Sequence, residues 1–130
     1  MKKNNKINFL VTRFVVPYIL CFAAYIQIFG EISPGGGFQA GAIFASCFIG
    51  YDLSVDNILS YIDSMVFLRT GAIGVLIYIL VGLFSVADGK YFLNYYSLNS
   101  QAFGIMLVEL GVGVTVSSVM IFIFLELKKC

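Results

Sequence analysis

Four apolar runs dominate this chain and decide what it can fold into. They cover approximately residues 9–29, 38–53, 65–87 and 104–125. A helix that crosses a bilayer needs about 20 apolar residues, and three of the runs reach that length. Inside lipid a helix satisfies its own backbone hydrogen bonds, so helices are what such runs form. The sequence predicts an all-α membrane protein: one integral membrane domain over residues 1–130, with about four transmembrane helices.

The composition excludes a soluble domain and the commonest kinds of active site. The chain is 60% hydrophobic and 12% charged, with a mean hydropathy of +0.95, whereas a soluble domain is roughly half apolar and about a quarter charged. There is no histidine, and the three cysteines show no CxxC spacing. The usual general base and a clustered metal site are therefore both missing. We expect no metal, no cofactor, no catalytic centre of its own and no nucleic-acid partner.

The basic residues predict the topology. They gather near the two ends of the chain, at Lys2, Lys3, Lys6, Arg13, Lys128 and Lys129. Lys and Arg mark the cytoplasmic side of transmembrane helices. Both termini are therefore expected to be cytoplasmic, which requires an even number of spans. The predicted location is the cell membrane (inner or plasma membrane), with lipid around a multi-pass protein.

A glycine-rich break lies before the second run. It reads Gly30-Glu31-Ile32-Ser33-Pro34-Gly35-Gly36-Gly37, on the outer side of this topology. Consecutive glycines are poor helix interior, and the apolar run from Phe38 to Tyr51 has only about 14 residues, short for a complete span. Two structures remain open. The break dips into the membrane where other protein shields it, which we favour, or the second helix is short and thins the bilayer locally.

Two further patterns concern the second run and the segment after it. Gly37, Gly41 and Ala45 recur every four residues, and this small-xxx-small spacing lets two membrane helices approach closely. It predicts a packing face, within the chain or against a partner. Residues 52–64 place Val55 and Leu59 on one helical face with polar residues opposite. This amphipathic pattern predicts a short helix in the cytoplasmic interface.

Glu109 is the strongest candidate for a functional side chain. It lies about five residues into the last run, roughly 7 Å below the outer edge at 1.5 Å per residue. An ionisable group there is costly and is a functional candidate by default. Ion handling or a polar subunit contact is one role. The other is an anchor that reaches up toward Lys90 or Gln101. Arg69 lies near the opposite edge and is expected to anchor its own helix.

Gln27 and Glu31 bracket the end of the first run, beside the glycine-rich break. Glu31 is either a solvated loop acid or a residue that faces the mouth of an ion path.

The glycine-rich block resembles a known family signature. Residues 30–41, GEISPGGGFQAG, are similar to the motif of the MnhB/MrpB-like family, which are subunits of the Mrp-type multisubunit Na⁺/H⁺ antiporters. That motif is approximately G-H-x-x-P-G-G-G-F-x-G-G. The matching positions are Gly30, Pro34, Gly35, Gly36, Gly37, Phe38 and Gly41. Glu31 stands where the family usually has histidine, so a proton-handling role of that histidine would here fall to an acid or be absent. Ala40 replaces a usual glycine and still permits close packing.

The resemblance implies a function and partners. The chain would be a small membrane subunit of a complex that exports Na⁺ in exchange for protons, needed for assembly and for ion exchange. Its partners would be the other membrane subunits of the antiporter, with Na⁺ and H⁺ as the transported ions. Glu109 and Glu31 would supply polar groups to an ion pathway or to a subunit contact.

Two alternatives remain beside this function. The family is also similar to membrane parts of certain hydrogenase complexes, so one alternative is a scaffold subunit of a hydrogenase-like or other respiratory redox complex. The other is a free-standing four-helix membrane protein. The short second run and the glycine-rich break count against it, because four short helices bury such a segment poorly.

Overall fold

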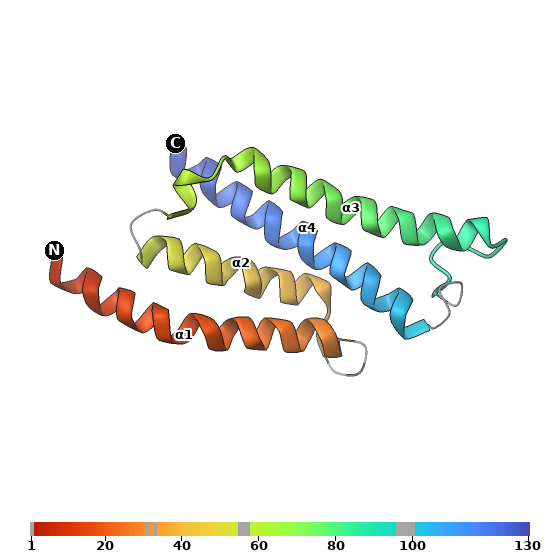
Figure 1. Ribbon diagram of the computed structural model, residues 1–130, viewed down its shortest axis with the longest axis horizontal. Coiled ribbons are helices and arrows are strands. Elements are labelled where there is room, and N and C mark those ends of the chain that lie inside the picture. The colour runs from red at the N-terminus through yellow and green to blue at the C-terminus, as the bar shows by residue number, and fades with distance from the viewer. Residues whose placement is uncertain (1, 31, 33, 55–57, 96–100) are drawn as a thin grey trace.

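The chain folds into four long helices, and the computed structural model describes residues 2–30, 32, 34–54, 58–95 and 101–130. In chain order the helices are α1 (Lys2–Phe29), α2 (Gly37–Ser54), the short 3₁₀ helix η1 (Ile58–Tyr61), α3 (Ser64–Ala87) and α4 (Gln101–Lys129). Within these residues every regular element is a helix (Figure 1). The predicted all-α class is confirmed.

Three of the helices are long and apolar enough to cross a bilayer, judged by length and composition: residues 6–29 of α1, all of α3 and all of α4. α2 has 18 residues and is not one of these three. It nevertheless lies alongside the others, and successive helices run in opposite directions (Figure 1). The chain is therefore a multi-pass membrane protein in which a shorter second helix completes the bundle.

The helices lie in the order α1, α2, α4, α3 across the molecule (Figure 1). α4 packs against both α2 and α3, whereas α1 packs mainly on α2 and touches α4 only sparingly. α1 begins and α4 ends at the same end of the bundle. The two ends of the chain therefore lie at one end of the bundle.

Glycines bring α4 close to both of its neighbours. A Cβ atom on Gly41 of α2 would lie 2.6 Å from the carbonyl oxygen of Gly113, and one on Gly74 of α3 would lie 2.6 Å from that of Gly111. Backbones can approach this closely only where side chains are missing, as is typical of helix contacts in membranes. α4 is thus the central helix of the bundle.

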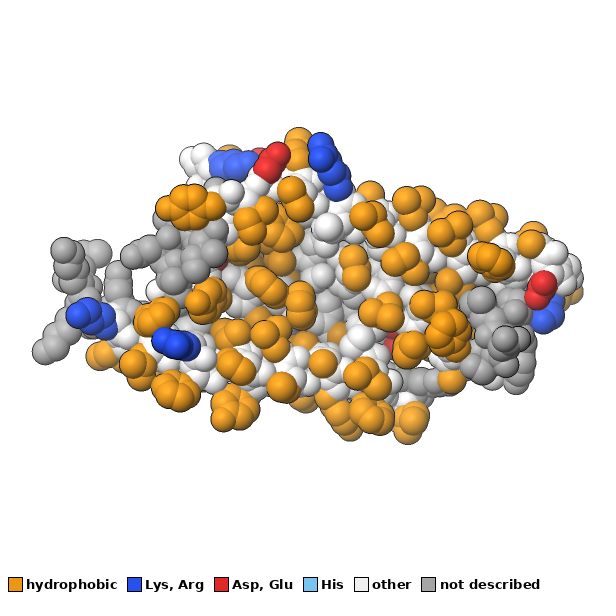
Figure 2. Space-filling model, in the orientation of Figure 1, with side chains coloured by type: hydrophobic (Ala, Val, Ile, Leu, Met, Phe, Trp, Pro, Cys, Tyr) orange, Lys and Arg blue, Asp and Glu red, His pale blue; other side chains and the backbone are white. Residues whose placement is uncertain are grey.

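Large apolar side chains cover much of the surface, and many of the buried residues are small. Phe14 and Phe84 are well exposed, whereas Ala45 and Ser85 are fully buried. Apolar side chains are spread over most of the face seen in Figure 2, and a few charged side chains lie among them. In water such a surface would drive association. In lipid it costs nothing, so the distribution fits a bundle surrounded by acyl chains.

The connection after α2 differs from its prediction. The short helix expected over residues 52–64 is wrong in its bounds, because α2 continues through Ser54 and a shorter helix, the four-residue η1, follows. Val55 lies outside the described residues. Asp52 accepts a hydrogen bond from the backbone N–H of Leu59 at 2.6 Å, and Leu59 is buried. Leu59 of η1 therefore packs into the bundle, whereas Tyr61 at the end of η1 is exposed.

Candidate functional site

The carboxylate of Glu109 lies against the glycine-rich turn between α1 and α2. A Cβ atom on Gly30 would lie 3.0 Å from Oε2 of Glu109, and one on Gly36 would lie 3.4 Å from Oε1. Gly36 has a φ of +133°, a conformation that L side chains rarely adopt. The predicted site residue Glu109 is thus next to two glycines of the motif.

The same turn brings α2 onto the backbone of α4. Gly37, the first residue of α2, is buried, and a Cβ atom there would collide with the carbonyl oxygen of Glu109. Gly35 is similarly constrained, since its Cβ would lie 2.9 Å from Cγ2 of Ile26. The consecutive glycines therefore let the turn fit between α1 and α4 with Glu109 at its centre.

The turn contacts α4 well inside the helix. Glu109 lies eight residues after Gln101, the first residue of α4, which is about 12 Å along the axis at 1.5 Å per residue. α3 and α4 both extend beyond the α1–α2 turn (Figure 1). The turn is therefore partly covered by α4 and does not project beyond the bundle.

The surroundings of Glu109 include a helix terminus. α2 begins at Gly37, and the N-terminal end of a helix carries a positive partial charge from its unpaired N–H groups. The carboxylate of Glu109 lies close to that end of α2. Glu109 is half-buried, and it lines a cavity of about 300 Å³ with Gln39 and the backbone of Gly35 to Gly37.

The other predicted site residues fall into three groups. Pro34 and Phe38 are exposed at the turn and at the start of α2. Gly41 packs against Gly113 of α4, and Ala45 is fully buried near Ile121. Glu31 lies outside the described residues. Among the described site residues, Glu109 is the acid, and it lies beside the glycines of the motif.

Comparison with known proteins identifies the family. Residues 7–122 match the family model described as a domain related to the MnhB subunit of Na⁺/H⁺ antiporter. The chain belongs to the MnhB family. A relative from Staphylococcus haemolyticus strain JCSC1435, named as antiporter subunit mnhB2, is 35% identical, with 98% of this chain and 97% of the relative covered. A relative of the same name from Staphylococcus aureus strain MRSA252 is 33% identical over the same shares.

Membership of the MnhB family confirms the resemblance that the glycine-rich block carries. The match extends over nearly the whole chain, so it includes α3 and most of α4 as well as the motif between α1 and α2. The contact between the motif and Glu109 thus joins two parts of the family domain that are far apart in sequence.

A second charged site escapes prediction from the sequence. Asp52 is 1% exposed, and its Oδ2 lies 2.6 Å from Nζ of Lys128. The ammonium group also lies 5.6 Å from the ring centre of Phe124, a favourable cation–π position. Asp52 and Lys128 are separated by 76 positions, and no local pattern links them. In this member of the MnhB family the ion pair between Asp52 and Lys128 thus links the C-terminal end of α2 to the last turn of α4.

Proposed function

We propose that this chain is a small membrane subunit of a multisubunit Na⁺/H⁺ antiporter, needed for assembly of the complex and for ion exchange. Membership of the MnhB family and the antiporter names of its relatives carry this proposal. Neither favours the alternative of a redox-complex scaffold. The chain acts with other membrane subunits, exchanges Na⁺ and H⁺ only as part of that complex, and has no catalytic centre of its own.

Glu109 is the residue of this chain that takes part in ion exchange or in a polar subunit contact. Its support is the contact of a half-buried carboxylate with the glycine-rich turn and the start of α2. The N-terminal end of α2 lies beside this carboxylate, and its positive partial charge attracts anionic groups. Glu31 in the adjacent segment is the second acid we assign to this role.

The variant Glu109→Gln tests this role because it keeps the shape of the side chain and removes its charge. We expect a severalfold lower rate of Na⁺-dependent proton movement in everted membrane vesicles, with the complex still assembled. Glu126→Gln on the same helix is the matched control. Glu126 interacts with Lys129 and Ser64 at the other end of α4, so exchange should be unchanged. Normal exchange in Glu109→Gln vesicles rules out the ion-handling role.

The location follows from the same proposal: the cell membrane, with both termini in the cytoplasm. Support comes from Lys6 and Arg13 on α1, Arg69 on α3 and Lys128 on α4, which all lie toward the end of the bundle where α1 begins and α4 ends (Figure 1). We expect fluorescence from green fluorescent protein fused to either terminus and no activity from alkaline phosphatase fused there. An active phosphatase at one terminus contradicts an even number of spans.

A further inference from the structure

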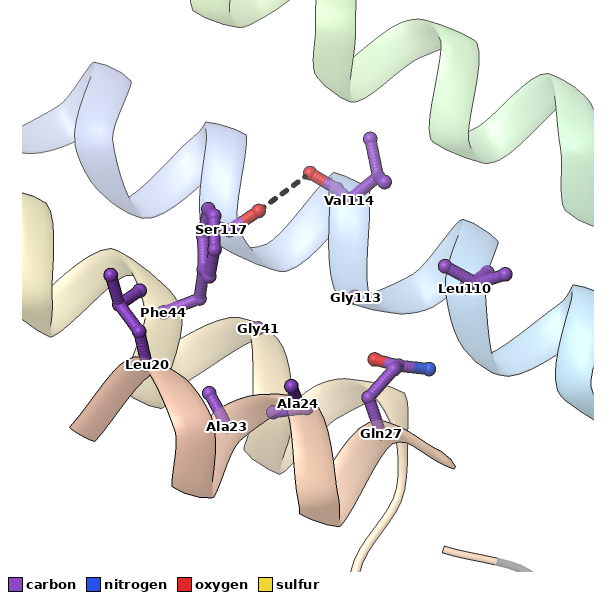
Figure 3. Close-up of a pocket in the computed structure, with 11 residues that line it drawn as sticks. Leu20, Ala23, Ala24, Gln27, Gly41, Phe44, Leu110, Gly113, Val114 and Ser117 are labelled. Carbon is purple, nitrogen blue, oxygen red and sulfur yellow. Dashed lines mark hydrogen bonds between the residues drawn. The ribbon is translucent and has the colours of Figure 1, made fainter. Parts of the chain in front are cut away.

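A groove on the side of the bundle lies between α1 and α4, with α2 as its floor. Its cavity has a volume of about 260 Å³. Figure 3 shows Ala24 and Gln27 of α1 on one wall, Gly113 and Ser117 of α4 on the other, and Gly41 of α2 between them. The groove exists because α1 packs on α2 and hardly touches α4.

The walls and the floor are small where a helix would need to come close. Ala24, Gly41 and Gly113 present at most a methyl group to the cavity. Membrane helices associate through such small residues, because close backbone approach replaces the hydrophobic effect that lipid removes. α1 also has the most unused surface, since 11% of its span is buried inside the molecule against 28% for α3.

Gln27 gives the groove a polar group that lipid cannot match. Its Nε2 atom is buried and has no hydrogen-bond partner among the described residues. Its Oε1 atom lies against Gly113, where a Cβ atom would be only 2.7 Å away. An unpaired buried donor is destabilising, and an acyl chain offers no acceptor. The amide can turn about its last side-chain bond, which brings its N–H groups to an acceptor in the groove.

We propose that this groove seats a transmembrane helix of another subunit of the complex, and that Gln27 donates a hydrogen bond to an oxygen of that helix. The inference rests on the proposed function, which supplies membrane partners. The occupant is an apolar helix with a carbonyl, hydroxyl or amide oxygen at the level of Gln27. Ser117, on the opposite wall, already donates its hydroxyl to the carbonyl of Val114 at 3.2 Å (Figure 3), so it does not compete for that oxygen.

Photo-crosslinking in native membranes tests the occupant of the groove. Phe44 lines the groove and is 42% exposed, and it is replaced by the photoreactive analogue benzoylphenylalanine. The same replacement at Phe84, exposed on α3, is the matched control. We expect an adduct between position 44 and a different subunit, at several times the yield found from position 84. An adduct to lipid alone, to a second copy of this chain, or to the same subunit at equal yield from both positions overturns the proposal.

Filling the groove is the complementary test. Ala24→Phe places a ring in the cavity without touching the core of the bundle, because Ala24 is exposed in this chain. Ala72→Phe, at an exposed position on α3, is its control. We expect the first variant to reach the membrane in normal amounts but to lose most of the subunits that purify with it, and the second to keep them. Equal retention of partners in both variants overturns the proposal.

Removing the donor tests the part played by Gln27. Gln27→Leu keeps the bulk of the side chain but removes its N–H donor. We therefore expect the partner subunits of this variant to dissociate at a lower detergent concentration than those of the natural chain. Unchanged retention contradicts the hydrogen bond. If the natural chain purifies with no antiporter subunit at all, the proposed function fails. If it purifies with them while the groove binds only lipid, the docking site alone fails.

Discussion

Replacing Gly37 by alanine is expected to push α2 away from α4 and to destabilise the bundle far more than the same replacement at Gly50. The added Cβ atom would collide with the carbonyl oxygen of Glu109, and a backbone atom inside a helix cannot turn aside as a flexible side chain can. Overpacking a well-packed contact typically costs about 1–3 kcal/mol. This contact is with backbone, so we expect a cost at the upper end of that range.

Gly50 offers a matched control in the same helix. Apart from the adjacent backbone of its own helix, a Cβ atom on Gly50 would meet no atom of the described residues within 4 Å, so Gly50→Ala adds the same methyl group to open space there. Alanine is the better helix former by about 1 kcal/mol, so this variant should be unchanged or more stable. The measurement is the fraction of monodisperse protein left after heating in detergent, followed by size-exclusion chromatography. Equal melting of the two variants contradicts the close approach of α2 and α4 at Gly37.

The general architecture could be predicted because lipid imposes it. Long apolar runs must be helices in a bilayer, and α3 spans Ser64–Ala87 where the sequence shows a run over residues 65–87. The hydropathy pattern reports only the part of a helix that suits lipid. It therefore starts the first run at Phe9, whereas α1 begins at Lys2, because a helix can continue into a polar sequence beyond the apolar run.

The contacts between helices could not be predicted in the same way. The spacing of Gly37, Gly41 and Ala45 predicts a packing face but does not name what lies against it. The structure places Gly37 at Glu109 and Gly41 at Gly113, so the face of α2 and the candidate acid belong to one contact. The choice of partner depends on how four helices fill space together, which no local pattern contains.

Asp52 shows the same limit for charged residues. Aspartate after an apolar run is typical of a solvated helix end, and the residues after it suggested an amphipathic helix. The carboxylate is instead enclosed, because Lys128 and the backbone N–H of Leu59 reach it from other elements of the fold. Burial of a charge becomes tolerable once it is paired and hydrogen-bonded, and only the folded chain shows that pairing.

Removing that carboxylate is the second large effect that we expect. Asp52→Ala leaves the ammonium group of Lys128 and the N–H of Leu59 without this acceptor. Breaking a fully buried pair from one side costs about 3–5 kcal/mol, and the Lys128 side chain is 27% exposed, so we expect a cost below that range. Asp52→Asn should cost less, since its amide oxygen can still accept from Leu59. Asp63→Ala is the matched control. Asp63 is exposed, and its carboxylate accepts a hydrogen bond from the backbone N–H of Met65 at the start of α3. Loss of such a helix cap costs about 1 kcal/mol.

A double-mutant cycle separates the ion pair from the rest of the contact. In the Asp52→Ala variant, Lys128 is left without its partner. Adding Lys128→Met removes that unpaired charge, so the double variant should recover part of the stability that Asp52→Ala loses. Methionine can still pack against Phe124, and no unpaired charge then remains beside Leu59. We expect a coupling free energy of about 1–3 kcal/mol between the two sites, within the range found for residues in direct contact, from thermal unfolding in detergent. Additive losses in the double variant would mean that the pair does not hold α2 to α4.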